Sequence, residues 1–129
     1  MEKKKRTILL IDDDSFLLEM YATKFTEKGF AVRSFGRGED AFAALKEGFS
    51  PDVILFDVIM PEMSGEEFLM RRKKEKIAPD ALLVGLSNQS DERTIETMKK
   101  QGLHQYILKA SMVPSQVVTE VERLLAEQK

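Results

Sequence analysis

Hydrophobic positions along the chain follow two alternating patterns, which together predict five pairs of a β-strand and an α-helix. Short apolar runs indicate strands, and apolar residues spaced three or four apart indicate amphipathic helices. The five predicted strands cover residues 7–11, 30–35, 53–57, 81–86 and 105–108. The five predicted helices cover residues 15–28, 39–47, 65–74, 91–101 and 114–127. This alternation predicts an α/β fold, in which helices cover both faces of a parallel sheet.

Glycine and proline mark several predicted helix ends. Gly29 and Gly48 each follow a helix at the position of a left-handed cap, and Pro114 suits the first turn of the last helix. No repeat, low-complexity stretch or linker interrupts the pattern, so we expect residues 1–129 to form one domain with a core of about 6–127. The apolar stripe of the first helix comprises Phe16, Leu17, Met20, Tyr21 and Phe25.

Composition narrows the class of protein. Hydrophobic residues make up 43% of the chain, charged residues make up 33%, and the net charge is −2, as in ordinary globular proteins. No apolar run approaches the ~20 residues of a helical membrane span, so we expect a cytoplasmic protein without membrane insertion. The mild negative charge argues against direct nucleic-acid binding. We interpret the basic run at residues 71–74 as a solvated helix end, where cations complement the helix dipole.

Polar side chains follow four of the five predicted strands. Asp12 and Asp13 follow the first strand, Asp57 ends the third, Ser87 follows the fourth and Lys109 follows the fifth. Parallel strands end at one edge of a sheet, so these residues are expected to share a crevice there. Three carboxylates in one crevice repel each other unless a cation neutralises them. The chain has no cysteine and one histidine, so the metal ligands must be oxygens, which Mg²⁺ prefers.

The same residues suggest phosphoryl transfer. A carboxylate can attack phosphorus to give an acyl phosphate, while Mg²⁺ and an ammonium group neutralise the transferring oxygens. Asp57 is the better candidate nucleophile because it stands alone at the end of a central strand, whereas Asp12 and Asp13 look like metal ligands. Lys109 can supply the ammonium group. The hydroxyl of Ser87 can donate a hydrogen bond to a phosphoryl oxygen and draw its loop inward.

Each of these residues also has an ordinary structural interpretation. An aspartate after a strand often caps the next helix, and we expect Asp14 to do only that. A single lysine is usually solvated, and a single serine commonly forms a turn or a cap. The functional interpretation is favoured because these residue types occur together, each at the end of a different predicted strand.

The motifs resemble those of the response regulator receiver family of two-component signalling. The matching pieces are Ile-Asp-Asp-Asp at 11–14, Asp-Val-Ile-Met-Pro-Glu-Met-Ser-Gly at 57–65, and the isolated Ser87 and Lys109. The resemblance extends over about residues 6–125. It implies a flavodoxin-like (βα)5 fold with a doubly wound five-stranded sheet in the strand order 2-1-3-4-5.

The resemblance also implies a role for each acidic residue. A histidine kinase or phosphotransfer protein would donate a phosphoryl group to Asp57. Asp13 and Asp57 would bind Mg²⁺ directly, together with the backbone carbonyl of Ile59, and Asp12 would act through water. The domain would catalyse its own phosphorylation and dephosphorylation rather than work as a conventional enzyme.

By the same resemblance, Ser87 and Lys109 would contact the phosphoryl group. Tyr106 matches the aromatic residue that turns inward when the hydroxyl residue moves; a half-buried strand tyrosine is the ordinary alternative. The fourth helix, fifth strand and fifth helix would bind an output partner. A homodimer through this surface stays open, as do the identities of the kinase and of the downstream protein.

One position departs from the family pattern. The lysine of receiver domains is usually followed by proline in a cis peptide, and here Ala110 follows Lys109. A cis peptide before a residue other than proline costs ~3 kcal/mol. Two conformations therefore stay open: a strained cis peptide, or a trans peptide that changes the direction of Lys109.

Two alternative functions fit parts of the sequence. Haloacid-dehalogenase-type phosphatases also have Asp-x-Asp after a first strand, as at residues 12–14, but their motif expects Thr or Val where this chain has Phe16. That fold also needs a longer chain and has no place for the segment at 57–65. The second alternative, motivated by Ala110, is a degenerate receiver that acts as a phosphorylation-independent protein-interaction module.

Overall fold

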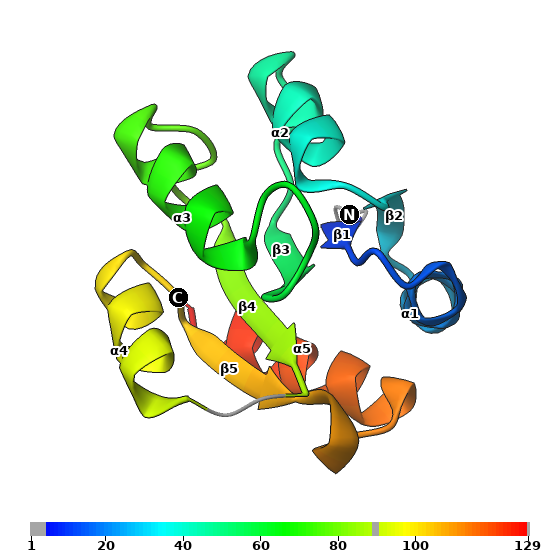
Figure 1. Cartoon of the computed structure of the whole chain (residues 1–129). Coiled ribbons are helices and arrows are strands. Elements are labelled where there is room, and N and C mark those ends of the chain that lie inside the picture. Colours follow the sequence, from blue (N-terminus) through cyan, green and yellow to red (C-terminus); the bar gives the residue numbers. More distant parts are fainter. Residues whose placement is uncertain (1–4, 89–90, 129) are drawn as a thin grey trace.

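A five-stranded parallel sheet forms the centre of the molecule (Figure 1). The computed structural model describes residues 5–88 and 91–128. The strands lie in the order β2-β1-β3-β4-β5, which confirms the order that the receiver resemblance implied. They are β1 (Thr7–Ile11), β2 (Ala31–Phe35), β3 (Val53–Asp57), β4 (Leu82–Ser87) and β5 (Gln105–Leu108).

Five α-helices follow the strands, and their ends differ from the predicted ends by no more than one residue. They are α1 (Ser15–Glu27), α2 (Gly38–Lys46), α3 (Gly65–Lys74), α4 (Glu92–Lys100) and α5 (Pro114–Ala126). A short 3-10 helix, η1 (Lys109–Ser111), lies between β5 and α5 where only a loop was expected. Asp14 caps α1 as predicted, because its carboxylate accepts from the N–H groups of Phe16 and Leu17.

The helices form two layers, with α2, α3 and α4 on one face of the sheet and α1 and α5 on the other (Figure 1). Successive strand residues point to opposite faces, so each strand supplies both layers of the core. In β1, Leu9 and Ile11 pack under α2 and α3, while Ile8 and Leu10 pack under α1 and α5. The predicted doubly wound architecture is confirmed. Within the part of the chain that the structure describes, no helix has the length and apolar character of a bilayer span.

The apolar stripe of α1 is narrower than predicted. Tyr21 and Phe25 are buried, but Phe16 is 70% exposed and Met20 is 36% exposed. Phe16 lies in the first turn of α1, just past the end of β1, where the sheet no longer extends beneath the helix. The spacing of Phe16 correctly indicated a helix, but Phe16 is not part of the hydrophobic core.

The basic run at the end of α3 is only partly solvated. Lys73 and Lys74 are exposed as predicted, but Arg72 is 7% exposed, so its assignment to a solvated helix end was wrong. Its guanidinium group donates to backbone carbonyls beyond α3 and at the end of α4. These acceptors come from tertiary structure, which the local charge pattern does not reveal.

Gly65 allows the loop after β3 to fold back against the end of the sheet. Its N–H donates to the carbonyl of Val58, at an N···O distance of 2.8 Å. A Cβ at this position would lie 2.8 Å from the Cα of Val58 and 2.9 Å from the carbonyl oxygen of Asp57. Only glycine fits this close to the backbone, and its presence places residues 58–64 beside Asp57.

We expect Gly65→Ala to lower the free energy of unfolding by about 1–3 kcal/mol, because the methyl group overlaps the backbone of residues 57 and 58. The higher helix propensity of alanine, worth up to about 1 kcal/mol, does not offset this overlap. Urea denaturation followed by circular dichroism measures the change. Glu66→Ala, one residue further along α3, serves as the control and should stay within about 0.5 kcal/mol of the parent. A Gly65→Ala protein as stable as the parent would contradict the close packing.

Candidate functional site

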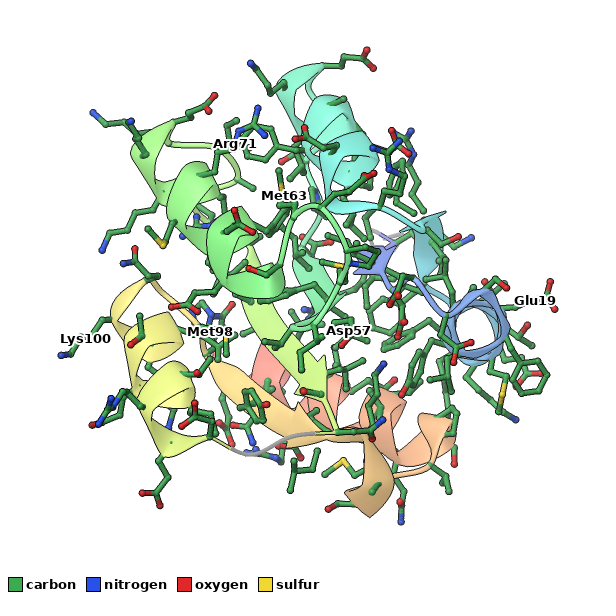
Figure 2. All side chains as sticks on the ribbon, in the orientation of Figure 1. Glu19, Asp57, Met63, Arg71, Met98 and Lys100 are labelled. Atoms are coloured by element: carbon green, nitrogen blue, oxygen red, sulfur yellow. The ribbon has the colours of Figure 1, made fainter. Side chains whose placement is uncertain are left out.

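The carboxyl edge of the sheet brings together most of the residues that the sequence singled out. Asp12 and Asp13 follow β1, and Asp57 is the last residue of β3, at the centre of this edge (Figure 2). One carboxylate oxygen from each of these three aspartates lies within 4.8 Å of the other two. The parallel strand order causes this convergence, because β1 and β3 are hydrogen-bonded neighbours.

Lys109 reaches the same cluster from the end of β5. Its Nζ lies 2.9 Å from Asp12 Oδ2 and 3.3 Å from Asp57 Oδ2. The Lys109–Ala110 peptide is trans, since the described residues contain no cis peptide bond. Of the two conformations left open by the sequence, the chain adopts the trans route. Lys109 lies in η1 and still points at both carboxylates.

Burial dominates the electrostatics of the site. Asp57 is 7% exposed, and desolvation raises its pKa from 3.8 to about 6, because the opposing charge of Lys109 only partly compensates and the charge of Asp12 adds to the increase. Burial also opposes the charge of Lys109. The hydrogen bond to Asp12 and the charges of Asp57 and Asp12 outweigh that burial, so the pKa of Lys109 is raised.

The cluster has the composition of a site for a hard cation. Three carboxylates and one ammonium group leave an excess of two negative charges, which one divalent cation balances. Asp13 is exposed while Asp12 and Asp57 are buried, so one side of the cluster faces solvent. All the clustered ligand atoms are oxygens, as Mg²⁺ requires. The N–H of Ile59 donates to Asp57 Oδ1 at 3.4 Å, which brings the backbone of the loop after β3 to the same place.

Ser87 and Tyr106 lie around a neighbouring hollow. Ser87 is 1% exposed at the end of β4, one residue past Leu86, which pairs with Asp57 in the sheet. Tyr106 of β5 is partly exposed. A cavity of about 230 Å³ lies between the loop after β3, Ser87, Tyr106 and the first turn of α4. The hydroxyl group and the aromatic ring therefore border one space next to the acidic cluster.

One interaction beside the site was not foreseen from the sequence. Arg37, before α2, donates to Glu62 Oε1 from Nε at 3.0 Å and from Nη2 at 2.6 Å. Glu62 has a φ of 72°, a left-handed conformation that is uncommon for residues other than glycine. The ion pair joins the loop after β2 to the loop after β3, which carries Ile59. No local pattern links residues 25 positions apart.

The fold and the site together define a class of protein: a doubly wound α/β domain with an aspartate cluster and a lysine at the carboxyl edge of its sheet. The chain belongs to the response regulator receiver domain family of two-component systems, whose family model matches residues 8–122. This membership excludes the haloacid-dehalogenase-type phosphatase, and the receiver function fits the sequence prediction.

Curated relatives are longer than this chain. The probable C4-dicarboxylate response regulator DctR of Bacillus subtilis is 35% identical over 111 residues, which cover 84% of this chain and 48% of that protein. The DNA-binding response regulator MtrA of Mycobacterium tuberculosis is 28% identical over 125 residues, 97% of this chain and 53% of that protein. The chain thus spans about half the length of these relatives.

Solved structures show the same fold. A CheY-like receiver domain protein from Methanospirillum hungatei superposes with a TM-score of 0.87 at 22% identity, covering 97% of both chains. The structure titled FixJ-N gives a TM-score of 0.80 at 24% identity, covering 98% of both chains. At these identities the superpositions establish the fold alone.

The raised pKa of Asp57 predicts a pH dependence of stability in metal-free protein. The native state binds the Asp57 proton more tightly than the unfolded chain, so the free energy of unfolding falls as the pH rises from about 4 to about 6. A change from pKa 3.8 to about 6 corresponds to about 3 kcal/mol at most. Asp57→Asn removes this titration, so its stability relative to the parent increases across that interval.

Urea denaturation in EDTA between pH 4 and pH 8 measures this difference. Asp52→Asn serves as the control, because Asp52 lies before β3 and away from the carboxyl edge. The stability difference between Asp57→Asn and the parent would be independent of pH if Asp57 had an ordinary pKa.

Proposed function

We propose that Asp57 accepts a phosphoryl group in a Mg²⁺-dependent reaction and that the phosphorylated domain signals through a partner-binding surface. The observation that carries this proposal is the arrangement of Asp57, which is buried, lies 3.3 Å from the ammonium group of Lys109 and shares a cluster with two further carboxylates. An aspartate held only for stability has no need of two like-charged neighbours.

We propose that Asp13 and Asp57 hold Mg²⁺ directly, together with the backbone carbonyl of Ile59, and that Asp12 acts through water. When bound, Mg²⁺ supplies charge neutralisation for the phosphoryl oxygens. Support comes from the oxygen-only ligand set, the excess of two negative charges and the solvent-facing side at Asp13.

Lys109 and Asp57 would carry out the transfer between them. A carboxylate oxygen of Asp57 forms a bond to phosphorus, and the bond from phosphorus to the donor's imidazole nitrogen breaks, leaving the electron pair on that nitrogen. Lys109 moves from its present contacts with Asp12 and Asp57 to the oxygens of the phosphoryl group, where its ammonium group stabilises the negative charge of the transition state. The donor is a histidine kinase or a phosphotransfer protein, the donor class that acts on receiver domains.

Ser87 and Tyr106 would convert the chemistry into a signal. The hydroxyl of Ser87 donates to a phosphoryl oxygen, and Tyr106 turns toward the cavity of about 230 Å³ that both residues border. The surface of α4, β5 and α5 then binds a downstream protein. DctR and MtrA are named as a response regulator and a DNA-binding response regulator. We expect this domain itself to act in the cytoplasm as one unit, residues 1–129, without direct nucleic-acid contact.

The alternative function, a degenerate receiver that only binds proteins, was motivated by Ala110. The Lys109–Ala110 peptide is trans, and Lys109 still contacts Asp12 and Asp57, so Ala110 gives this alternative little support.

We expect incubation with Mg²⁺ and acetyl phosphate to add the mass of one phosphoryl group, measured by intact-protein mass spectrometry. EDTA and Asp57→Asn should each abolish the increase, while Asp52→Asn should keep it. No mass increase with Mg²⁺ present would reject phosphoryl acceptance and favour the interaction module.

Lys109→Ala should slow phosphorylation by about a hundredfold, because a preorganised cation no longer neutralises the transferring oxygens. The rate of acyl phosphate formation at saturating Mg²⁺ measures this loss. Mg²⁺ affinity should not fall, since the substitution removes a competing positive charge from the cluster. Lys24→Ala on α1 is the matched control, because that lysine pairs only with Glu27 among the described residues. An unchanged rate in Lys109→Ala would remove the lysine from the mechanism.

A further inference from the structure

Arg72 is a buried cation whose side-chain hydrogen bonds, among the described residues, are to backbone carbonyls. Its Nη1 donates to the carbonyls of Ile77 and Ala78, and its Nη2 donates to the carbonyl of Gln101, each at 3.3 Å. Nε is buried without a hydrogen-bond partner in the structure, and no carboxylate of the described residues is among the causes that shift the pKa of the side chain. Burial lowers the pKa of Arg72, since nothing nearby balances its charge.

The loop that follows α3, residues 75–80, has a strained backbone, and Arg72 forms hydrogen bonds to it. Lys76 has a φ of 56° and Ala78 a φ of 49°, both in the left-handed region. At the corresponding position after α1, α2 and α4 the chain uses glycine, at Gly29, Gly48 and Gly102. After α3, Lys76 and Ala78 adopt left-handed conformations although neither is glycine, and the carbonyls of Ile77 and Ala78 accept from Arg72. Strain of this kind persists only where the surroundings impose it.

The same guanidinium group ties down the C-terminal end of α4. Gln101, whose carbonyl Arg72 binds, is the C-cap of α4, and Lys73 Nζ donates to the carbonyl of Lys100 at 3.2 Å. A Cβ at Gly102 would lie 3.1 Å from Arg72 Nη2. Glycine at this position therefore leaves room for the guanidinium group to reach the carbonyl of Gln101. Two adjacent side chains of α3 therefore bind two adjacent carbonyls of α4.

The N-terminal end of α4 is held differently. Asp91, the N-cap, accepts from Arg93 and Thr94, both within the first turn of the same helix. The cavity of about 230 Å³ lies beside this end and is lined by Asp91 and Thr94. Met98 is the one buried side chain of α4, and it lies toward the C-terminal end, on the side facing the sheet, whereas Lys100 points away (Figure 2). The C-terminal end of α4 is therefore bound by side chains of α3, whereas its N-terminal end lies beside a cavity.

We propose that Arg72 is a positioning residue that anchors the C-terminal end of α4, so that the helix pivots about this end when Asp57 is phosphorylated. This inference rests on the proposed function, because phosphorylation supplies the movement at Ser87 that displaces the N-terminal end. Ion pairing does not explain Arg72, because its burial disfavours the charged form and no carboxylate of the described residues is among the causes of its lowered pKa. What an arginine adds is a fixed connection between three carbonyls on two separate segments.

The pivot is tested by measuring both ends of α4 separately. The chain has no cysteine, so introduced cysteines carry spin labels only where they are placed. Exposed Glu92 and Lys100 mark the two ends of α4, and exposed Glu122 on α5 gives a reference on the opposite face of the sheet. Double electron–electron resonance measures the 92–122 and 100–122 distances before and after addition of Mg²⁺ and beryllofluoride, a phosphoryl mimic.

In the parent chain, beryllofluoride should shift the 92–122 distance and leave the 100–122 distance unchanged. In Arg72→Met, it should shift both distances. Arg71→Met is the matched control and should behave like the parent, because Arg71 is the adjacent cation but contacts Glu39 and Glu75 instead of α4. Equal shifts at both ends of the parent helix, or an unmoved 100–122 distance in Arg72→Met, would overturn the anchor.

Two further measurements separate this inference from the proposed function. If Arg72→Met does not fold, Arg72→Met/Lys76→Gly relieves the strained cap, and the released α4 end is measured there. Without any phosphoryl mimic, Arg72→Met should already broaden the 100–122 distance distribution and leave the 92–122 distribution as in the parent. An unchanged distribution overturns the anchor whether or not Asp57 is phosphorylated, while absence of acyl phosphate in the parent rejects only the proposed function.

Discussion

A single ammonium group holds two buried carboxylates together at the carboxyl edge of the sheet, and the geometry of the site depends on it. Lys109 contacts Asp12 at 2.9 Å and Asp57 at 3.3 Å. Without this cation, the two carboxylates would repel each other across a poorly solvated space and one would take up a proton. Even with it, burial raises the pKa of Asp57 to about 6. The attraction between Lys109 and the two carboxylates therefore orients the side chains that the parallel strands bring to one place.

The sequence predicted the fold and the members of the site because both depend on local patterns. Strand runs and helical spacing are local, and a parallel sheet brings all strand ends to one edge whatever the details of packing. Knowing that Asp12, Asp57 and Lys109 each follow a strand was therefore sufficient to predict that they meet. The predicted boundaries differ from the observed ones by no more than one residue for the same reason.

Features that depend on distant partners were not predictable in this way. The exposure of Phe16 depends on where the sheet ends beneath α1, and the ion pair of Arg37 with Glu62 joins residues 25 positions apart. Arg72 lies within a run of four cations, of which it is the buried one, and only the arrangement of α3 beside α4 distinguishes it. The sequence left two conformations open for the Lys109–Ala110 peptide, and only the structure shows that it is trans and that Lys109 still reaches both carboxylates.

The two ends of α4 lie at opposite ends of the strands. One end lies beside the acidic cluster, and the other end is the one that α3 binds. The first turn of α4 borders a cavity beside Ser87, next to the acidic cluster, while its last residues bind Arg72 and Lys73 at the other edge. A helix free at both ends would respond to a change at Asp57 by shifting in many directions, which spreads the response over many conformations. A helix fixed at one end moves mainly by rotating about that end, so under the proposed anchor a small movement at Ser87 would rotate the surface beside β5. Burying the charge of Arg72 without an ion-pair partner among the described residues costs free energy. The proposed anchoring of α4 explains why an arginine is kept at this position.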